Sequence, residues 1–99
     1  MSDFHVIIRG DSMWPTFSDG EKIMASEVSK KKLTIGDIVV SKHPFKSEVI
    51  IVKRINRILA DNRLFLQGDN PDPLASEDSH NFGPVKNNLI IGIINRENK

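Results

Sequence analysis

The apolar residues of this chain occur in short runs, rich in β-branched side chains, that are closed by glycine, proline, aspartate or asparagine. Residues 38–40 (IVV) and 48–59 are the clearest runs, and residues 68–73 (GDNPDP) are a segment dense in turn-forming residues. No convincing stretch has the 3.6-residue periodicity of an amphipathic helix. The pattern therefore predicts an all-β fold of about seven short strands, arranged as a small bent antiparallel sheet or a partly open barrel.

Other local patterns predict turns and irregularities within this fold. Asp61 and Asn62 predict a hairpin-like turn, and Gly92 predicts a bulge or bend in the last strand. The basic stretch 29–32 is expected to be a solvated loop. Further strands are expected at residues 4–9, 22–25, 64–67 and 89–94. Functional side chains are therefore expected mainly in the loops between strands.

The composition indicates one domain, residues 1–99, with a single modest core. The chain has 14 basic and 13 acidic side chains and no cysteine, which excludes disulfides, thiolate metal sites and thiol catalysis. A net charge of +1 favours neither nucleic acid nor an anionic membrane as a partner. The apolar runs are too short to span a bilayer, and the N-terminus lacks the pattern of a secretory signal. We therefore expect a soluble cytoplasmic domain without a membrane anchor.

Ser12 lies in the segment GDSMWPT (10–16), directly after the apolar run 6–8. This arrangement predicts a hydroxyl presented at the end of a strand. Gly10 allows a peptide backbone to come close, while Pro15 fixes its own φ and is expected to keep the chain after Ser12 extended. Glycine, aspartate and serine in sequence are by themselves more often an ordinary strand-ending turn. Ser12 is thus a candidate nucleophile only if a base accompanies it.

A serine nucleophile needs a base to accept its proton, and Lys53 is a better candidate than any histidine. The three histidines are scattered and show neither a triad spacing nor the helical pairing of metal ligands, so no metal site is expected. Strand alternation places Lys53 on the same face as Ile51 and Ile55, where desolvation lowers a lysine pKa and favours the neutral amine. The alternative is a lysine that covers the core with its methylenes and keeps its charge in water.

Four segments, in order along nearly the whole chain, resemble the motif boxes of type I signal peptidases and the related LexA-type self-cleaving proteins. That family has a serine box, a Gly-Asp box leading into a strand, a Lys-Arg pair in a strand, and a Gly-Asp-Asn box that ends in Ser-X-Asp-Ser. The resemblance implies a serine endopeptidase with a Ser/Lys dyad. The matching segments are GDSMWPT (10–16), GDIVV (36–40), VKRI (52–55), and GDN (68–70) with SEDS (76–79) and FGPV (82–85).

The resemblance also implies roles for the residues that match functional positions of the family. Ser12 looks like the nucleophile and Lys53 like the general base. Ser76 matches a serine that orients the lysine amine, and Asp78 matches an acidic residue that braces the site. His80 stands where an arginine usually pairs with that acidic residue, which would make the brace sensitive to pH.

The residues around the candidate nucleophile are expected to contact an extended peptide that adds as a strand to a sheet edge. Core packing is an equal alternative for Met13. Because Gly10 replaces a hydroxyl donor found in many relatives, the backbone N–H of the nucleophile is the chief expected oxyanion donor. Arg54 points to the strand face opposite Lys53 and is expected to support the site structurally. The expected substrate-binding residues are Gly10, Asp11, Met13 and Pro15.

In its small size and missing anchor, the chain resembles one subgroup of the family, the anchorless nickel-type superoxide dismutase maturation proteases. That likeness implies removal of an N-terminal leader peptide from a precursor protein, with nickel superoxide dismutase as the expected partner. The nickel would belong to the substrate, and no cofactor is expected in this chain. Two alternatives stay open. One is a LexA-type self-cleaving domain, which needs an upstream segment carrying its cleavage site, and the other is a non-catalytic β-barrel interaction module.

Overall fold

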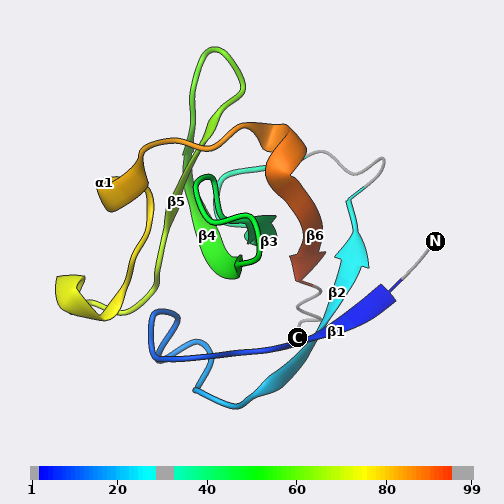
Figure 1. Ribbon diagram of the computed structural model, residues 1–99, viewed down its shortest axis with the longest axis vertical. Helices are drawn as coiled ribbons and strands as arrows, with labels where there is room; N and C mark the ends of the chain where they lie inside the picture. The colour runs from blue at the N-terminus through cyan, green and yellow to red at the C-terminus, as the bar shows by residue number, and fades with distance from the viewer. Residues whose placement is uncertain (1–2, 29–32, 95–99) are drawn as a thin grey trace.

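A computed structural model describes residues 3–28 and 33–94 of the chain, and six strands account for most of its regular structure (Figure 1). Helical structure there is limited to one turn of α-helix, α1 (Ser79–Phe82), and two 3₁₀ turns, η1 (Pro73–Ala75) and η2 (Asn87–Leu89). The all-β prediction is confirmed, with six strands in the described residues where about seven were expected, and the basic stretch 29–32 lies outside those residues. The strands are β1 (Asp3–Ile7), β2 (Lys22–Glu27), β3 (Ile38–Lys42), β4 (Ile50–Ile58), β5 (Leu64–Gln67) and β6 (Ile90–Ile94).

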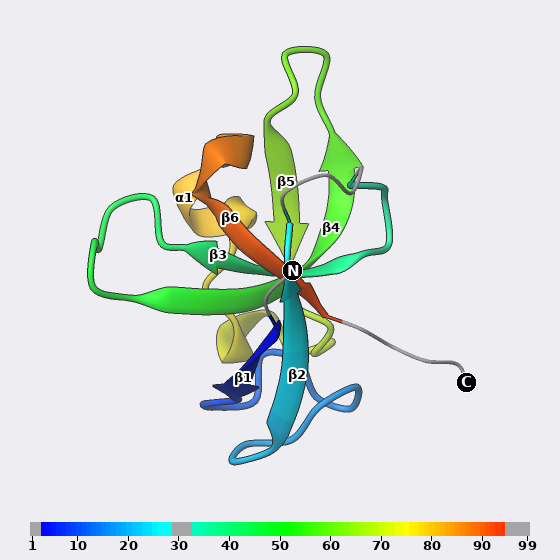
Figure 2. The same ribbon diagram turned by 90° about the vertical axis from the view of Figure 1, so that its right-hand side faces the viewer.

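All six strands form one antiparallel sheet in the order β1-β2-β6-β3-β4-β5, so β1 and β5 are its edges and it is not closed into a barrel. Figures 1 and 2 show that the sheet is strongly coiled. Coiling brings the loop after β1 beside the segment that follows β5, and the two are joined by a hydrogen bond from the Asn70 N–H to the Ser12 carbonyl. Segments from the two edges of the sheet therefore meet at one place.

The coiled sheet buries its apolar side chains in two clusters and not in the single core expected from the composition, because both faces of the central strand β3 are covered. Ile38 and Val40 enter the first cluster and Val39 enters the second. A strand that is buried on both faces needs apolar side chains at successive positions, which explains the unbroken run 38–40. The buried members of the first cluster are Ile8, Met13, Phe17, Ala25, Ile38, Val40 and Ile94, and those of the second are Val39, Ile55, Leu64, Leu66, Val85, Ile90 and Ile93.

Two irregularities predicted from single residues are confirmed. The pairing of β3 with β6 shifts register between Val40 and Ser41, opposite Gly92, as expected for a bulge. Asn62 has φ 69° in the turn between β4 and β5, a conformation that asparagine tolerates better than most residues. These features set the local bends of the sheet without altering its strand order.

The segment between β5 and β6 is largely irregular, yet it is fixed to the sheet by hydrogen bonds. Asp78 caps α1 by accepting the His80 N–H at 3.0 Å, and the buried Ser79 hydroxyl accepts the Leu66 N–H of β5 at 2.9 Å. Asp78 is thereby held in a defined position next to β5. Among the described residues, no helix has the length and hydrophobicity that crossing a membrane requires.

Candidate active site

The loop after β1 leaves Ser12 half-buried and turns the following residues into the core. Met13 is 1% exposed and packs in the first apolar cluster. Residues 11–17 fold into consecutive turns, in which the Phe17 N–H donates to the Met13 carbonyl at 2.9 Å. The expectation that Pro15 keeps this segment extended is therefore wrong, because burial of two large apolar side chains four residues apart requires the chain to fold back.

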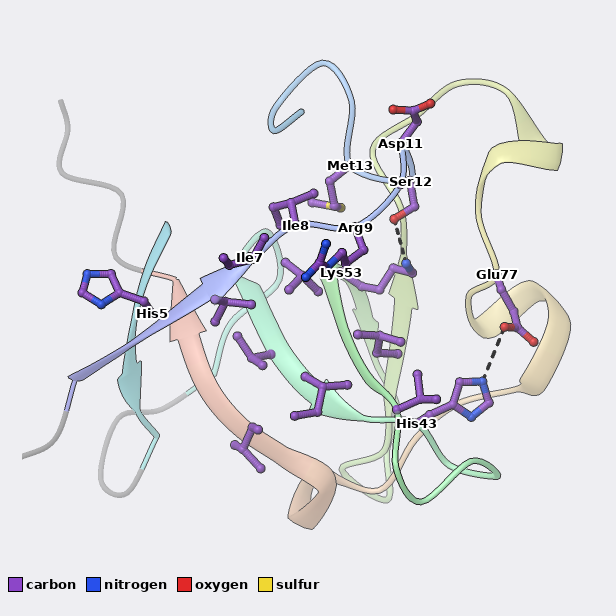
Figure 3. Close-up of a pocket in the computed structure, with 18 of the residues that line it drawn as sticks. His5, Ile7, Ile8, Arg9, Asp11, Ser12, Met13, His43, Lys53 and Glu77 are labelled. Atoms are coloured by element: carbon purple, nitrogen blue, oxygen red, sulfur yellow. Dashed lines mark hydrogen bonds and ion pairs between the residues drawn. The ribbon is translucent and has the colours of Figure 1, made fainter. Parts of the chain in front are cut away.

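Lys53 of β4 reaches the hydroxyl of Ser12, and its Nζ donates to Ser12 Oγ at 2.9 Å (Figure 3). The lysine is only 5% exposed. Burial lowers the pKa of Lys53 below its ordinary value of 10.5, although the carboxylates of Asp78 and Glu77 act in the opposite direction. The site therefore pairs a hydroxyl with an amine that loses its proton more readily than a lysine in water.

Asp78 is held as a carboxylate close to this pair. Its Oδ2 accepts the Gly68 N–H at 3.1 Å and the Ser76 hydroxyl at 3.2 Å, and its Oδ1 lies 2.9 Å from His80 Nδ1. Burial by itself would raise the pKa of Asp78, but hydrogen bonds from Gly68 and His80 outweigh it and lower the pKa. Among the described residues Ser76 bonds to Asp78 and not to Lys53, so an orienting role of Ser76 stays a prediction.

The segment 68–70 supports the nucleophile loop through backbone contacts that motif matching did not assign. Asn70 donates its backbone N–H to the Ser12 carbonyl at 2.9 Å and its side-chain Nδ2 to the Asp11 carbonyl at 2.8 Å. A Cβ added to Gly68 would lie 2.6 Å from the same Ser12 carbonyl oxygen. In the sequence these residues were noted as turn formers and as the GDN motif box, and neither signal reveals which loop they contact.

A second network lies around Arg54, next to Lys53 in β4. Arg54 forms a bidentate pair with Asp69, from Nε to Oδ1 at 2.9 Å and from Nη2 to Oδ2 at 2.8 Å. Its Nη1 donates to the Gly36 carbonyl at 2.7 Å, and Asp69 also accepts the Thr16 hydroxyl. The network therefore ties the strand that carries Lys53 to the nucleophile loop and to the turn before β3.

Replacing Arg54 with lysine should lower the free energy of unfolding by about 1–2 kcal/mol, because one ammonium group cannot span both Asp69 oxygens and the Gly36 carbonyl. Urea unfolding measures this change. The matched control is Arg63→Lys, since Arg63 pairs with Asp61 where both side chains are exposed, and there we expect a clearly smaller loss. Equal losses in the two variants would contradict a supporting role for the Arg54 network.

A cleft of about 560 Å³ lies between β1 and β4 and reaches Ser12 (Figure 3). Its walls are largely aliphatic, contributed by β1 and by the first half of β4. The residues expected to bind substrate are only partly brought together, since Gly10, Asp11 and Met13 line the cleft but the exposed Pro15 does not. Met13 packs in the core, as the alternative expectation had it, and its contact with a substrate stays a prediction. A largely aliphatic cleft of this size can bind the apolar side chains of a ligand.

The reactive groups at the end of this cleft are a hydroxyl, a buried amine and a backbone N–H. Within the described residues, the Ser12 N–H makes no hydrogen bond, so it is available to a negatively charged oxygen. Residues 3–28 and 33–94 contain no group of three or more histidine, aspartate or glutamate side chains that could hold a metal ion. The arrangement can deprotonate the serine hydroxyl and stabilise charge on a carbonyl oxygen that it attacks.

This chain is similar in sequence to two protease subunits. The first is mitochondrial inner membrane protease subunit 1 of Xenopus tropicalis, 33% identical over 110 residues that cover 90% of this chain. The second is mitochondrial ATP-independent inner membrane protease subunit 1a of Arabidopsis thaliana, 31% identical over 109 residues that cover 86% of this chain. The chain spans 65% and 64% of the lengths of these two relatives.

Both names place the relatives at the mitochondrial inner membrane, which contradicts the expectation of a cytoplasmic domain. That expectation rested on the absence of an apolar run long enough to span a bilayer and of a secretory-signal pattern. Such a run shows whether a segment crosses the membrane, but it does not show where a domain works.

The family is shown by a match along almost the entire chain. The sequence profile of the Peptidase S24-like family matches residues 1–93. The resemblance to signal peptidases and LexA-type proteins is thereby confirmed at the level of the family, whereas neither named relative is a superoxide dismutase maturation protease. From the profile match over residues 1–93, we conclude that this chain belongs to the Peptidase S24-like family.

Proposed function

We propose that this chain is a serine endopeptidase in which Lys53 takes the proton of Ser12. The observation that carries the proposal is the 2.9 Å contact between Lys53 Nζ and Ser12 Oγ, made by a lysine that is 5% exposed. A buried amine has a lowered pKa and can act as a base under mild conditions. Within the described residues no histidine forms a hydrogen bond with Ser12, so Lys53 is the base that the geometry favours.

The reaction follows from these positions. Ser12 Oγ attacks the carbonyl carbon of the scissile peptide bond while its proton passes to Lys53 Nζ, and the oxyanion accepts the Ser12 N–H. The C–N bond then breaks, the Lys53 ammonium protonates the leaving amine, and an ester to Ser12 remains. Water then attacks the ester carbon while it gives a proton to Lys53 Nζ. The ester C–O bond breaks, the Lys53 ammonium returns that proton to Ser12 Oγ, and the new carboxyl terminus is released.

The edge of β1 offers a place for the substrate backbone. Both backbone groups of Ile8 point away from the open edge, since its N–H donates to the Glu21 carbonyl and its carbonyl accepts the Gly20 N–H. Backbone groups alternate in direction along a strand, so those of Ile7 and Arg9 face the open edge. A peptide that pairs there as an added strand would carry its scissile carbonyl to Ser12.

The named relatives support a protease that works at a membrane, since both are inner membrane protease subunits. We propose that this chain removes an N-terminal leader from a precursor protein at a membrane surface, as the resemblance to signal peptidases implies. A precursor of nickel superoxide dismutase is the narrower candidate substrate, which only the resemblance stated from the sequence suggests. One experiment tests both the leader-removing activity and this narrower substrate.

Incubation of the protein with precursors should yield one defined cut, which mass spectrometry of the product N-terminus locates. The precursors to compare are a nickel superoxide dismutase precursor and unrelated proteins with N-terminal leaders. Ser12→Ala should lower turnover at least about 10³-fold, because it removes the nucleophile. Ser47→Ala is the matched control, since Ser47 is exposed and does not line the cleft, and it should retain full turnover.

The outcomes separate the peptidase activity from the identity of its substrate. Ser12-dependent cleavage of other leaders but not of the superoxide dismutase precursor would keep the peptidase and remove that substrate. Binding of precursors without any Ser12-dependent cleavage would instead favour a non-catalytic interaction module.

A further inference from the structure

One buried polar group in the cleft has no role in the proposed reaction, namely Nε2 of His43 in the turn after β3. His43 is 4% exposed and lines the cleft. Its Nδ1 accepts the Phe45 N–H at 3.0 Å, so the proton of the neutral ring is assigned to Nε2. Among the described residues this Nε2–H has no hydrogen-bond partner. A buried donor without an acceptor costs free energy and requires an explanation.

Glu77 supplies an acceptor near this donor but does not satisfy it. Its Oε1 lies 3.6 Å from His43 Nε2, beyond hydrogen-bond distance (Figure 3). The Glu77 side chain is 54% exposed and lines the same cleft, whereas the His43 ring is buried and packs against Phe82 with ring centroids 4.9 Å apart. A fixed donor therefore faces a movable acceptor in a cleft that is otherwise largely aliphatic.

We propose that His43 and Glu77 form a polar subsite for a neutral substrate side chain that carries both a hydrogen-bond acceptor and a donor, a hydroxyl or a carboxamide. The inference rests on the proposed function, because it assigns specificity to the same cleft. The acceptor of the substrate side chain binds the His43 Nε2–H, and its donor binds the Glu77 carboxylate. A hydroxyl oxygen at about 2.8 Å from both atoms satisfies both groups, and rotation of the exposed Glu77 side chain makes room for it.

The charges around the pair argue against ionised side chains at this subsite. A carboxylate would face the carboxylate of Glu77. An ammonium or guanidinium group would face the His43 donor and the ammonium of Lys46, whose Nζ lies 3.5 Å from Glu77 Oε1. An aliphatic side chain would leave the His43 donor unpaired and would desolvate the Glu77 carboxylate without offering it a hydrogen bond. Only a neutral group with both hydrogen-bonding functions satisfies the two residues together.

The test uses decapeptides of alanine in which one position at a time is substituted. Two pairs of substituents are compared at each position, threonine with valine and asparagine with leucine, because the members of a pair match in shape and differ in hydrogen bonding. Turnover is measured with the wild-type chain, and binding is measured by fluorescence anisotropy with Ser12→Ala. At one position we expect the polar peptide to be favoured about tenfold, and we expect the ratio to fall to about one in Glu77→Ala and in His43→Phe. Glu48→Ala, which changes an exposed glutamate outside the cleft lining, should keep the ratio.

Two readouts separate the subsite from the catalytic proposal. A polar preference in binding that both variants abolish supports the subsite even if nothing is cleaved, in which case the peptidase proposal fails alone. Cleavage without a polar preference, or with a preference that survives in Glu77→Ala, overturns the subsite and leaves the peptidase standing. Should no peptide bind or be cleaved, both are overturned. Because Glu77 is exposed, Glu77→Ala keeps the test valid if His43→Phe misfolds.

Discussion

Replacing Lys53 with methionine is expected to abolish peptide cleavage and at the same time to raise the melting temperature. Methionine keeps the length and apolar stem of lysine but cannot accept a proton, so turnover should fall at least about 10³-fold. The buried ammonium is costly to desolvate, and its removal should increase the free energy of unfolding by about 1–3 kcal/mol. Peptide turnover and thermal unfolding of the same preparation measure the two effects.

The stability gain should depend on pH in a defined direction. The unfolded chain keeps the Lys53 proton up to about the ordinary pKa of 10.5, whereas the folded protein releases it at lower pH. Between the two pKa values the unfolded state binds more protons, so the stability of the wild type rises with pH and the advantage of Lys53→Met shrinks. Wild-type turnover should rise over the same range as the amine becomes neutral.

Lys53→Arg is the control for this prediction, because arginine keeps a positive charge and cannot act as a base. It should be inactive without the gain in stability. Substantial turnover by Lys53→Arg, or a melting temperature of Lys53→Met below that of the wild type, would contradict the role proposed for a buried neutral amine.

Replacing Gly68 with alanine should damage the site from a position that performs no chemistry. The added Cβ would lie 2.5 Å from Ser76 Oγ and 2.6 Å from the Ser12 carbonyl oxygen. That carbonyl is held by the Asn70 N–H at 2.9 Å, so it cannot move away without losing the hydrogen bond. We expect a loss of about 1–3 kcal/mol in stability and a fall in kcat of at least about tenfold, because Ser12 shifts relative to Lys53.

Gly20→Ala is the matched control for Gly68→Ala. Gly20 has φ 86°, which disfavours alanine, yet a Cβ there meets no atom within 4 Å, so this variant loses stability without crowding the site. Its kcat should equal that of the wild type when it is measured well below the melting temperature. If the two variants lost stability equally and both kept full kcat, the close contact at Gly68 would have no part in positioning Ser12.

The prediction from sequence was most successful where the physical cause is local. The run 38–40, the turn at Asn62 and the bulge opposite Gly92 follow from side-chain branching and backbone preference, and all three are present. The turns at 11–17 were missed because burial of Met13, a tertiary effect, overrides the preference of Pro15 for an extended chain. His43 gave no signal, since a histidine before a proline looks the same whether its ring is buried or exposed.

By itself the sequence determined the strands, the family and the identities of the candidate reactive side chains, because alternation, turn chemistry and ordered motifs can be read along the chain. Only the tertiary structure decided how these side chains meet. Coiling of the sheet places the Ser12 hydroxyl 2.9 Å from an amine that lies 41 residues away in sequence, and it sets His43 against Glu77 in the same cleft. Distances across a coiled sheet depend on its twist and on the packing of two cores, and neither is encoded at any single position.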